Sequence, residues 1–209
     1  MTGSAGTQTI FVVDDDPGVL KALSRMLRAE GWSVETFDSA DAFLARPDHT
    51  GDGCLVLDVT MPGLDGLELQ RRLAEAGQSL PIVFVTGHGD IPMSVQAIKA
   101  GAKDFLTKPV QAQALVAAVR AAIAQDASAR QARAETAELR QRLASLTPRE
   151  REVLMALAAG RLNKQIAGDL GVVEQTVKFH RARIMERMRA KTVAELMHIA
   201  ARLGIGPRA

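Results

Sequence analysis

Short apolar runs alternate with longer amphipathic segments through the first 125 residues of the chain. The runs are rich in β-branched residues, and several are apolar throughout, which predicts strands buried on both faces of a sheet. The predicted strands cover residues 9–13, 33–37, 54–58, 81–86 and 104–106. Helical periodicity between them predicts helices over 17–30, 66–76 and 91–100. This order predicts a doubly wound α/β domain, residues 1–125, with five parallel strands and a site at their carboxyl ends.

The segment that follows this domain has a helical pattern but little apolar surface. Residues 111–146 contain neither Gly nor Pro, and residues 126–137 contain no large apolar side chain. Such a stretch cannot bury much area, so we predict a semi-rigid helical linker over 126–145 that continues from the last helix of the first domain. A disordered hinge in its centre is the alternative.

Residues 146–209 predict an all-α domain of four short helices. These cover 148–159, 163–170, 174–188 and 192–203. Thr147 as N-cap, Pro148 at the first helical position and Glu150 two residues later predict a capping box. Gly171 ends the second helix, and a basic helix follows after a short turn, which is the arrangement of a helix-turn-helix.

The charge of the chain is divided unevenly between the two predicted domains. The net formal charge of +2 conceals 15 acidic against 10 basic residues over 1–125, and 6 acidic against 12 basic residues over 146–209. A small domain with this excess of cations is expected to meet a polyanion. Nucleic acid is therefore the leading candidate partner of the C-terminal domain.

The amino-acid composition indicates the class of protein and the compartment in which it works. The chain is 47% hydrophobic and 3% aromatic, as expected of a helix-rich globular protein. Cys54 is the only cysteine, which excludes an internal disulfide and a thiolate zinc site and favours a reducing compartment. Because the chain has neither a signal peptide pattern nor about 18 consecutive apolar residues, we expect a cytoplasmic location and no membrane partner.

Chemically active side chains follow the predicted strands at their carboxyl ends. They are Asp14, Asp15 and Asp16 after the first strand, Asp58 at the third, Thr86 at the fourth and Lys108 after the fifth. Carboxylates brought together repel one another unless a cation compensates them, and hard oxygen ligands favour Mg²⁺. A lysine and a hydroxyl opposite suit a phosphoryl group. This set predicts phosphoryl transfer to a carboxylate.

The motifs VVDDD, LVLDVTMPGLDG, VFVTGHGD and AGAKDFLTKPV occur in this order. They resemble the receiver motifs of two-component response regulators over about residues 9–125. The resemblance implies that Asp58 is the phosphoacceptor and that Asp14, Asp15, Asp58 and the backbone carbonyl of Thr60 bind Mg²⁺, with Asp16 as a neighbour. It also implies that Thr86 and Lys108 hold the phosphoryl oxygens, that Phe105 is the switch aromatic, and that the peptide bond from Lys108 to Pro109 is cis. Two alternatives stay open. Phe105 could be simply a core residue, and His88 could be a surface residue rather than one that tunes dephosphorylation.

The segment LTPREREVLMALAAGRLNKQIAGDLGVVEQTVKFHRARIMERM resembles the helix-turn-helix of LuxR-type regulators. Together with the receiver motifs, it makes the chain similar to the FixJ/NarL family over nearly its whole length, in the FixJ-like branch with a long helical linker. The resemblance implies a transcription regulator that a sensor histidine kinase phosphorylates, that dimerises, binds promoter DNA and acts on RNA polymerase. It also implies that the protein is not a turnover enzyme.

On the predicted helix 174–188, helical spacing divides the side chains between two faces. Val177, Ile184, Met188 and in part His180 are predicted to face inward, and Lys178, Arg181, Ala182 and Met185 outward. We assign base-edge contacts to Lys178, Arg181 and Ala182, with Phe179 at the edge of the footprint, and phosphate contacts to Lys164, Gln175, Thr176 and Arg183. A solvated basic face is the alternative.

Two features of the C-terminal domain concern the start of the basic helix and the role of the last helix. Val173 stands where the family commonly has Ser or Thr, which predicts a weaker N-cap before the basic helix. The last helix carries Val193, Leu196, Met197 and Ala200, which would supply a dimer contact in this family. Burial of these side chains within their own domain is the alternative.

Two other functions compete with phosphorylation-controlled transcription. An Mg²⁺-dependent phosphohydrolase is disfavoured, because Thr60 stands where a second aspartate would act as acid and base, and because no GxxxxGK[ST] loop is present. A DNA-bound scaffold that is never phosphorylated is disfavoured by the complete set of acidic residues, Thr86 and Lys108.

Overall fold

The computed structural model describes residues 8–46, 53–87 and 91–206. Its contacts divide the chain into two compact units, Met1–Ala129 and Arg130–Ala209, which we call the receiver unit and the C-terminal unit. Within the described residues, no helix is both long enough and apolar enough to span a bilayer.

The receiver unit contains a five-stranded parallel sheet with the strand order β2-β1-β3-β4-β5. The strands are β1 (Thr9–Val13), β2 (Ser33–Phe37), β3 (Gly53–Leu57), β4 (Ile82–Thr86) and β5 (Asp104–Thr107). The helices are α1 (Pro17–Ala29), α2 (Ala40–Leu44), α3 (Gly66–Glu75), α4 (Ile91–Lys99) and the first part of α5 (Ala112–Ala144). The predicted doubly wound fold is confirmed.

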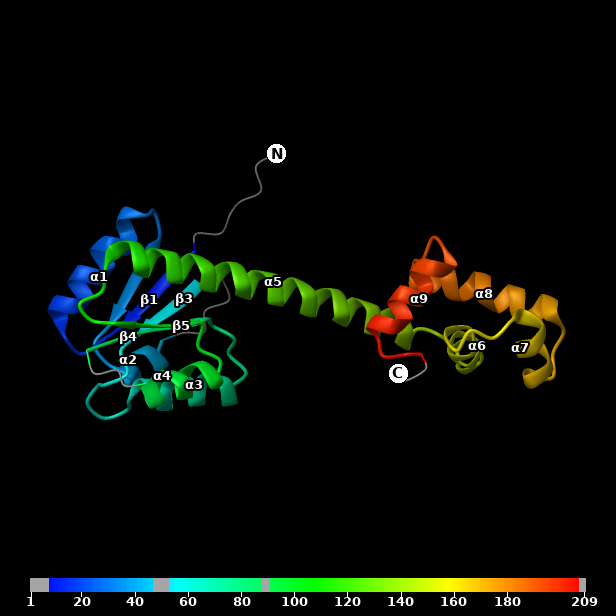
Figure 1. Ribbon diagram of the computed structural model, residues 1–209, viewed down its shortest axis with the longest axis horizontal. Helices are drawn as coiled ribbons and strands as arrows, with labels where there is room; N and C mark the ends of the chain where they lie inside the picture. Colours follow the sequence, from blue (N-terminus) through cyan, green and yellow to red (C-terminus); the bar gives the residue numbers. More distant parts are fainter. Residues whose placement is uncertain (1–7, 47–52, 88–90, 207–209) are drawn as a thin grey trace. The chain divides into compact units, whose positions relative to one another are not determined.

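Helices cover both faces of this sheet (Figure 1), and an apolar core layer lies between the sheet and the helices on each side. Leu27 of α1 and Leu115 and Val119 of α5 pack on one face, where all three side chains are fully buried. Phe43 of α2 and Leu69 of α3 pack on the other face. Because β1, β3 and β4 are buried along their whole length, both layers need the continuous apolar runs that the sequence shows.

Helix α2 is an element that the sequence analysis did not place. It has only 5 residues and begins after Ser39, whose hydroxyl accepts a hydrogen bond from the Ala42 N–H at 3.3 Å. A helix this short contains less than two turns, so hydrophobic periodicity has too few positions to reveal it.

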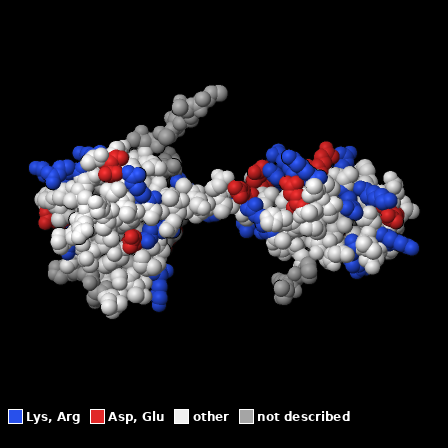
Figure 2. All heavy atoms as spheres, turned by 45° about the horizontal axis from the view of Figure 1, so that its top comes forward, with Lys and Arg blue, Asp and Glu red and all other residues white. Residues whose placement is uncertain are grey.

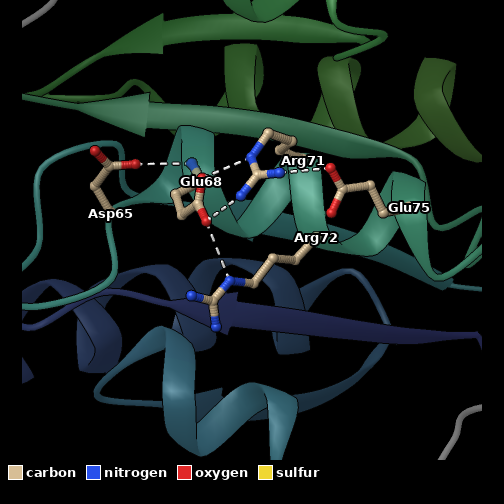
Figure 3. A network of polar contacts seen from close by, with 5 residues as sticks. All are labelled: Asp65, Glu68, Arg71, Arg72 and Glu75. Atoms are coloured by element: carbon tan, nitrogen blue, oxygen red, sulfur yellow. Dashed lines mark hydrogen bonds and ion pairs between the residues drawn. The ribbon is translucent and has the colours of Figure 1, made fainter.

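Helix α3 begins after Asp65, whose carboxylate accepts from the Glu68 N–H at 2.8 Å. On its exposed side, Arg71 lies between Glu68 and Glu75, and Arg72 also reaches Glu68 (Figure 3). Hydrogen bonds from Arg71 and Arg72 lower the pKa of Glu68 to about 2. The network keeps Glu68 ionised and supports the exposed turn of the helix.

Helix α5 runs without interruption through 33 residues and takes part in both units. Its first turns pack on the receiver sheet, whereas Leu139 is buried in the core of the C-terminal unit. The Arg142 guanidinium donates to the Met188 carbonyl at 3.3 Å. Within the C-terminal unit, the last turns of α5 therefore pack beside the end of α8.

The rest of the C-terminal unit is helical. The helices are α6 (Pro148–Ala158), α7 (Asn163–Leu170), α8 (Glu174–Met188) and α9 (Val193–Arg202). The predicted capping box is present, since Thr147 and Glu150 each accept from the other's backbone N–H. Leu154 of α6, Ile166 of α7 and Ile184 of α8 are fully buried and fill the core between these helices.

Candidate functional sites

The ends of four strands bring the predicted chemical groups to one edge of the sheet. Asp14 follows β1, Asp58 follows β3, Thr86 ends β4 and Lys108 follows β5. The backbone stays paired just past the strands: the Asp58 N–H donates to the Val13 carbonyl at 2.9 Å, and the Lys108 N–H donates to the Thr86 carbonyl at 2.8 Å. These backbone hydrogen bonds fix the positions of the Cα atoms from which the Asp58 and Lys108 side chains extend.

Lys108 is the centre of this cluster. Its Nζ lies 2.6 Å from Oδ2 of Asp14 and 2.6 Å from Oδ2 of Asp58. Both carboxylates are buried, with 1% of Asp14 and 6% of Asp58 exposed. One ammonium thus holds two carboxylates together, and the cluster keeps an excess negative charge.

The electrostatics of the cluster reflect this imbalance. Burial raises the pKa of Asp14 above its ordinary value, although hydrogen bonds from Lys108 and the Asp16 N–H oppose the effect. Burial alone would lower the pKa of Lys108, but its hydrogen bonds to Asp14 and Asp58 outweigh that effect and raise the pKa. The lysine is therefore held in its charged form between the two acids.

Asp15 completes an oxygen-rich group that suits a hard cation. One carboxylate oxygen from each of Asp14, Asp15 and Asp58 lies within 4.8 Å of the others, and Asp15 is exposed. Such a donor set of oxygens fits a hard cation such as Mg²⁺. Thr60 lies beside the cluster, because its N–H donates to Oδ1 of Asp58 at 3.1 Å.

Asp16 has a structural role rather than a place in the cluster. Its carboxylate accepts from the N–H groups of Gly18 at 2.7 Å and Val19 at 3.3 Å, so it is the N-cap of α1. This agrees with its prediction as a neighbour of the acidic group.

Gly66 is a residue of this site to which the sequence analysis gave no role. A Cβ on Gly66 would lie 2.2 Å from the Asp58 carbonyl oxygen, closer than two atoms can approach. The Gly66 N–H also donates to the Val59 carbonyl at 2.9 Å. Gly66 therefore lets α3 start directly against the backbone of Asp58, which the motif LVLDVTMPGLDG could have indicated.

Thr86 and Phe105 lie on neighbouring strands next to the cluster. Thr86 is fully buried and is paired with Thr107 in the β4–β5 register. Phe105 is half-buried, and its ring lies 6.1 Å from that of Phe84. The predicted cis peptide bond between Lys108 and Pro109 is present. His88 lies outside the described residues.

The helix-turn-helix consists of α7, a short turn and α8. Gly171 ends α7 in the left-handed conformation with φ 66°. Val173 is the N-cap of α8 and offers no side-chain hydrogen bond there, as its residue type predicts. Val177, Ile184 and Met188 are fully buried and His180 is half-buried, which confirms the predicted inward stripe.

The prediction that Met185 faces outward is wrong. Its side chain is half-buried and packs against the core of the C-terminal unit. The chain turns back directly after α8, and the Ala190 N–H donates to the Met185 carbonyl at 2.9 Å. Met185 stands beside the buried Ile184 and three residues before the buried Met188, so it borders the inward stripe.

The other outward positions of α8 are accessible to different degrees. Lys178, Phe179 and Ala182 are exposed, whereas Arg181 is half-buried and donates to Oδ1 of Asn163 at 2.8 Å. Asn163, at the start of α7, thus orients a predicted contact residue, and the sequence analysis missed it. Such a bond between two helices has no signal in the local sequence.

The predicted phosphate contacts surround these positions. Lys164, Gln175 and Arg183 are exposed, and Thr176 is half-buried. Figure 2 shows Lys and Arg side chains spread over the visible face of the C-terminal unit. The structure therefore presents all predicted contact residues at least partly at the surface, and Arg183 pairs with Glu186 at 3.1 Å.

The last helix, α9, exposes fewer apolar side chains for a dimer contact than the sequence predicts. Leu196 and Ala200 of α9 are 1% exposed and belong to the core of their own unit. The prediction that they supply a dimer contact is wrong for these two side chains, because they already close the core over α6. Val193, at 39% exposed, remains accessible.

Comparison with known families gives two matches along the chain. Residues 10–120 match the response regulator receiver domain, and residues 144–200 match the bacterial regulatory proteins of the luxR family. The first region contains the carboxylate cluster, and the second contains the helix-turn-helix.

Individual relatives match both regions together. The response regulator protein TodT of Pseudomonas putida is 46% identical over 93% of this chain and 86% of its own length. The transcriptional regulatory protein FixJ of Rhizobium meliloti is 41% identical over 95% of this chain and 98% of its own. Among solved structures, the response regulator StyR is 47% identical, covers 94% of this chain and 100% of its own, and has a TM-score of 0.82. Full-length FixJ from B. japonicum is 42% identical, covers 95% of this chain and 98% of its own, and has a TM-score of 0.57.

Proposed function

This chain belongs to the two-component response regulators that join a receiver domain to a LuxR-type DNA-binding domain, and we propose that phosphoryl transfer to Asp58 controls its dimerisation and its binding to promoter DNA. As a member of this family it is a transcription regulator. We assign residues 1–125 to the receiver, 126–145 to a helical linker and 146–209 to DNA binding.

One observation carries this proposal: Lys108 bridges the buried Asp14 and Asp58 at 2.6 Å from each. In phosphoryl transfer from a phosphohistidine of the sensor kinase, an Asp58 carboxylate oxygen attacks phosphorus and the bond from phosphorus to the imidazole nitrogen breaks. The Lys108 ammonium is already within reach of the new phosphoryl oxygens, which carry more negative charge than the carboxylate.

A metal ion fits beside this lysine. Asp14, Asp15, Asp58 and the backbone carbonyl of Thr60 would hold Mg²⁺, which supplies positive charge against the phosphoryl oxygens when it is bound. Asp14 and Lys108 then have complementary tasks: the first holds the cation, and the second neutralises the phosphoryl group from the other side. A carboxylate cluster without this compensation would repel the incoming phosphoryl group.

Thr86 and Phe105 connect the site to the surface of the receiver. The Thr86 hydroxyl would hold a phosphoryl oxygen, and Phe105 would turn inward as the face formed by α4, β5 and the start of α5 rearranges. Helix α4 exposes 80% of Ile91, 44% of Val95 and 46% of Ile98, which follow one another on one side of the helix. An apolar stripe of this kind supports contact with a second receiver.

The C-terminal unit supplies the DNA contacts. Lys178, Arg181 and Ala182 would reach base edges in the major groove, with Phe179 at the edge of the footprint. Lys164, Gln175, Thr176 and Arg183 would contact phosphates. A DNA-bound dimer would then act on RNA polymerase, and the chain would work by binding rather than by turnover of an external substrate.

Phosphoryl labelling of the full chain tests the receiver assignment. Acetyl phosphate with Mg²⁺ should label the parent protein, and Asp58→Asn should abolish the label, because Asp14, the other acid paired with Lys108, is assigned to the metal. Asp41→Asn is the matched control, since Asp41 is an exposed acid in α2, and it should be labelled like the parent. Equal labelling of the Asp58→Asn protein would contradict the site, and repeated turnover of a phosphate ester would favour a phosphohydrolase.

A further inference from the structure

Helix α8 exposes an aromatic side chain at the edge of the surface that is proposed to enter the major groove. Phe179 is 57% exposed and lies in the second turn of the helix. Residues near the start of a recognition helix are the ones that reach base edges. The inward stripe of α8 is already filled by Val177, Ile184 and Met188, so the core does not require Phe179.

The neighbours of Phe179 hold its ring but do not cover it. The Arg183 guanidinium lies 5.5 Å from the ring centroid, one turn further along the helix. The His180 ring lies 5.9 Å away in an edge-on arrangement. These contacts restrict the ring from one side and leave more than half of the side chain facing outward.

The cations around Phe179 are each engaged by another polar group. Lys178 lies 3.4 Å from Glu174, and Arg181 donates to Asn163. Phe179 and Ala182, three residues apart on α8, form between them an exposed apolar strip. The surface offered to DNA is therefore mixed, with an apolar strip of Phe179 and Ala182 beside the cations Lys178 and Arg181.

We propose that Phe179 recognises thymine through the C5-methyl group of the base. This inference rests on the proposed binding of DNA by α8 and extends it to the class of sequence that is recognised. A phenyl ring has no hydrogen-bond donor, and the thymine methyl is the apolar group that base edges present in the major groove. Ala182 adds a small apolar surface beside the ring, where a long side chain would keep the base at a distance.

The experiment compares thymidine with deoxyuridine, which differs from thymidine only by lacking this methyl group. Full-length protein, activated with beryllofluoride and Mg²⁺, first selects its preferred duplex from a random library. Each thymine of that duplex is then replaced singly by deoxyuridine, and affinities are measured at fixed salt. At one or two positions, the replacement should weaken binding of the parent protein about fourfold, as expected when one methyl-sized group is no longer buried.

The variant Phe179→Ala should bind the thymine and deoxyuridine duplexes equally well at those positions, because the coupling between ring and methyl is gone. Met155→Ala is the matched control, since Met155 is an apolar residue of α6 that is 55% exposed, and it should keep the parent's discrimination. A parent protein that selects a duplex but is insensitive to every replacement would overturn the inference and leave the proposed function standing.

Two other results are equally decisive. If Phe179→Ala weakened binding to both duplexes while the fourfold difference persisted, the ring would contact the DNA backbone, and the inference would be wrong. If the activated parent protein enriched no duplex at all, the proposed DNA-binding function itself would fail, and the inference with it.

Discussion

The two proposed sites of this chain are built in opposite ways. The carboxylate cluster joins residues far apart in sequence, since Lys108 lies 94 positions from Asp14 and 50 from Asp58. On the outward face of α8 two ion pairs are local, Glu174 with Lys178 and Arg183 with Glu186, although Arg187 near the end of the helix also pairs with Glu150 of α6. The first site exists only when the whole sheet is folded, whereas the second needs only α8 and the neighbouring α7 to be held in place.

The two sites also differ in how much their ion pairs contribute to the free energy of folding. The carboxylates of the cluster are buried, so an unpaired charge there would be costly. The pairs Glu174–Lys178 and Arg183–Glu186 on α8 are largely exposed, and such pairs each stabilise a helix by only about 0.2–0.5 kcal/mol. Substitutions should therefore affect folding in the receiver unit and mainly recognition in the C-terminal unit.

The largest effect on stability is expected for Lys108→Met. Without the ammonium, Asp14 and Asp58 face one another with no counter-charge, and the receiver transition in urea without Mg²⁺ should lose about 3 kcal/mol, the lower end for a broken buried pair. Added Mg²⁺ should stabilise this variant more than the parent, because the cation replaces part of the missing charge. Lys103→Met, at an exposed position, is the control and should behave like the parent. An unchanged transition would mean that the pairing contributes nothing to the fold.

The second effect concerns DNA recognition. Arg181→Ala should cost about 1–3 kcal/mol on the preferred duplex and blur the preference at one base pair, because a base-edge contact is lost. Lys164→Ala should instead weaken binding to preferred and random DNA alike and reduce the slope of log K against log salt by about 1. Fluorescence anisotropy over a salt series measures both quantities. If the ratio of preferred to random affinity stayed the same in Arg181→Ala and in Lys178→Ala, α8 would be a general basic surface.

Sequence patterns predicted the receiver unit well, because a parallel sheet buried on both faces needs continuous apolar strands. The same topology brings Asp14, Asp58 and Lys108 to one edge, so their convergence could also be predicted. The missing element, α2, is too short to show a period. Gly66 was overlooked as part of the site, because its role depends on how closely α3 approaches the backbone of Asp58.

Prediction was less complete where one helix packs against another. The period of α8 identifies its inward stripe, but it cannot show that Met185 packs against the core of the C-terminal unit. It also cannot show that Asn163 holds Arg181 or that Leu196 belongs to the core. These features depend on where neighbouring helices lie, which a periodic pattern does not contain.

The smallest effect is a pH dependence of the C-terminal unit. Burial alone would raise the pKa of Glu150, but hydrogen bonds from Thr147 and the charge of Arg187 outweigh it and hold the pKa below its ordinary value. A lowered folded-state pKa stabilises the unit above the unfolded-state pKa of about 4.3, and this stabilisation is lost as the pH falls through the folded-state value. Glu150→Gln keeps a capping-box residue without the charge. Thermal unfolding should therefore depend less on pH in this variant below about pH 5, and an identical pH profile would contradict the role of the charge.

The most direct measurement of the central claim is the affinity of the full chain for its preferred duplex, with and without beryllofluoride, in the parent and in Asp58→Asn. In the parent protein, beryllofluoride with Mg²⁺ should tighten binding by about 5- to 150-fold, the usual range of a coupling between two sites. In Asp58→Asn the affinity should not respond. Equal affinity of the parent protein in both conditions would contradict control of DNA binding by the receiver.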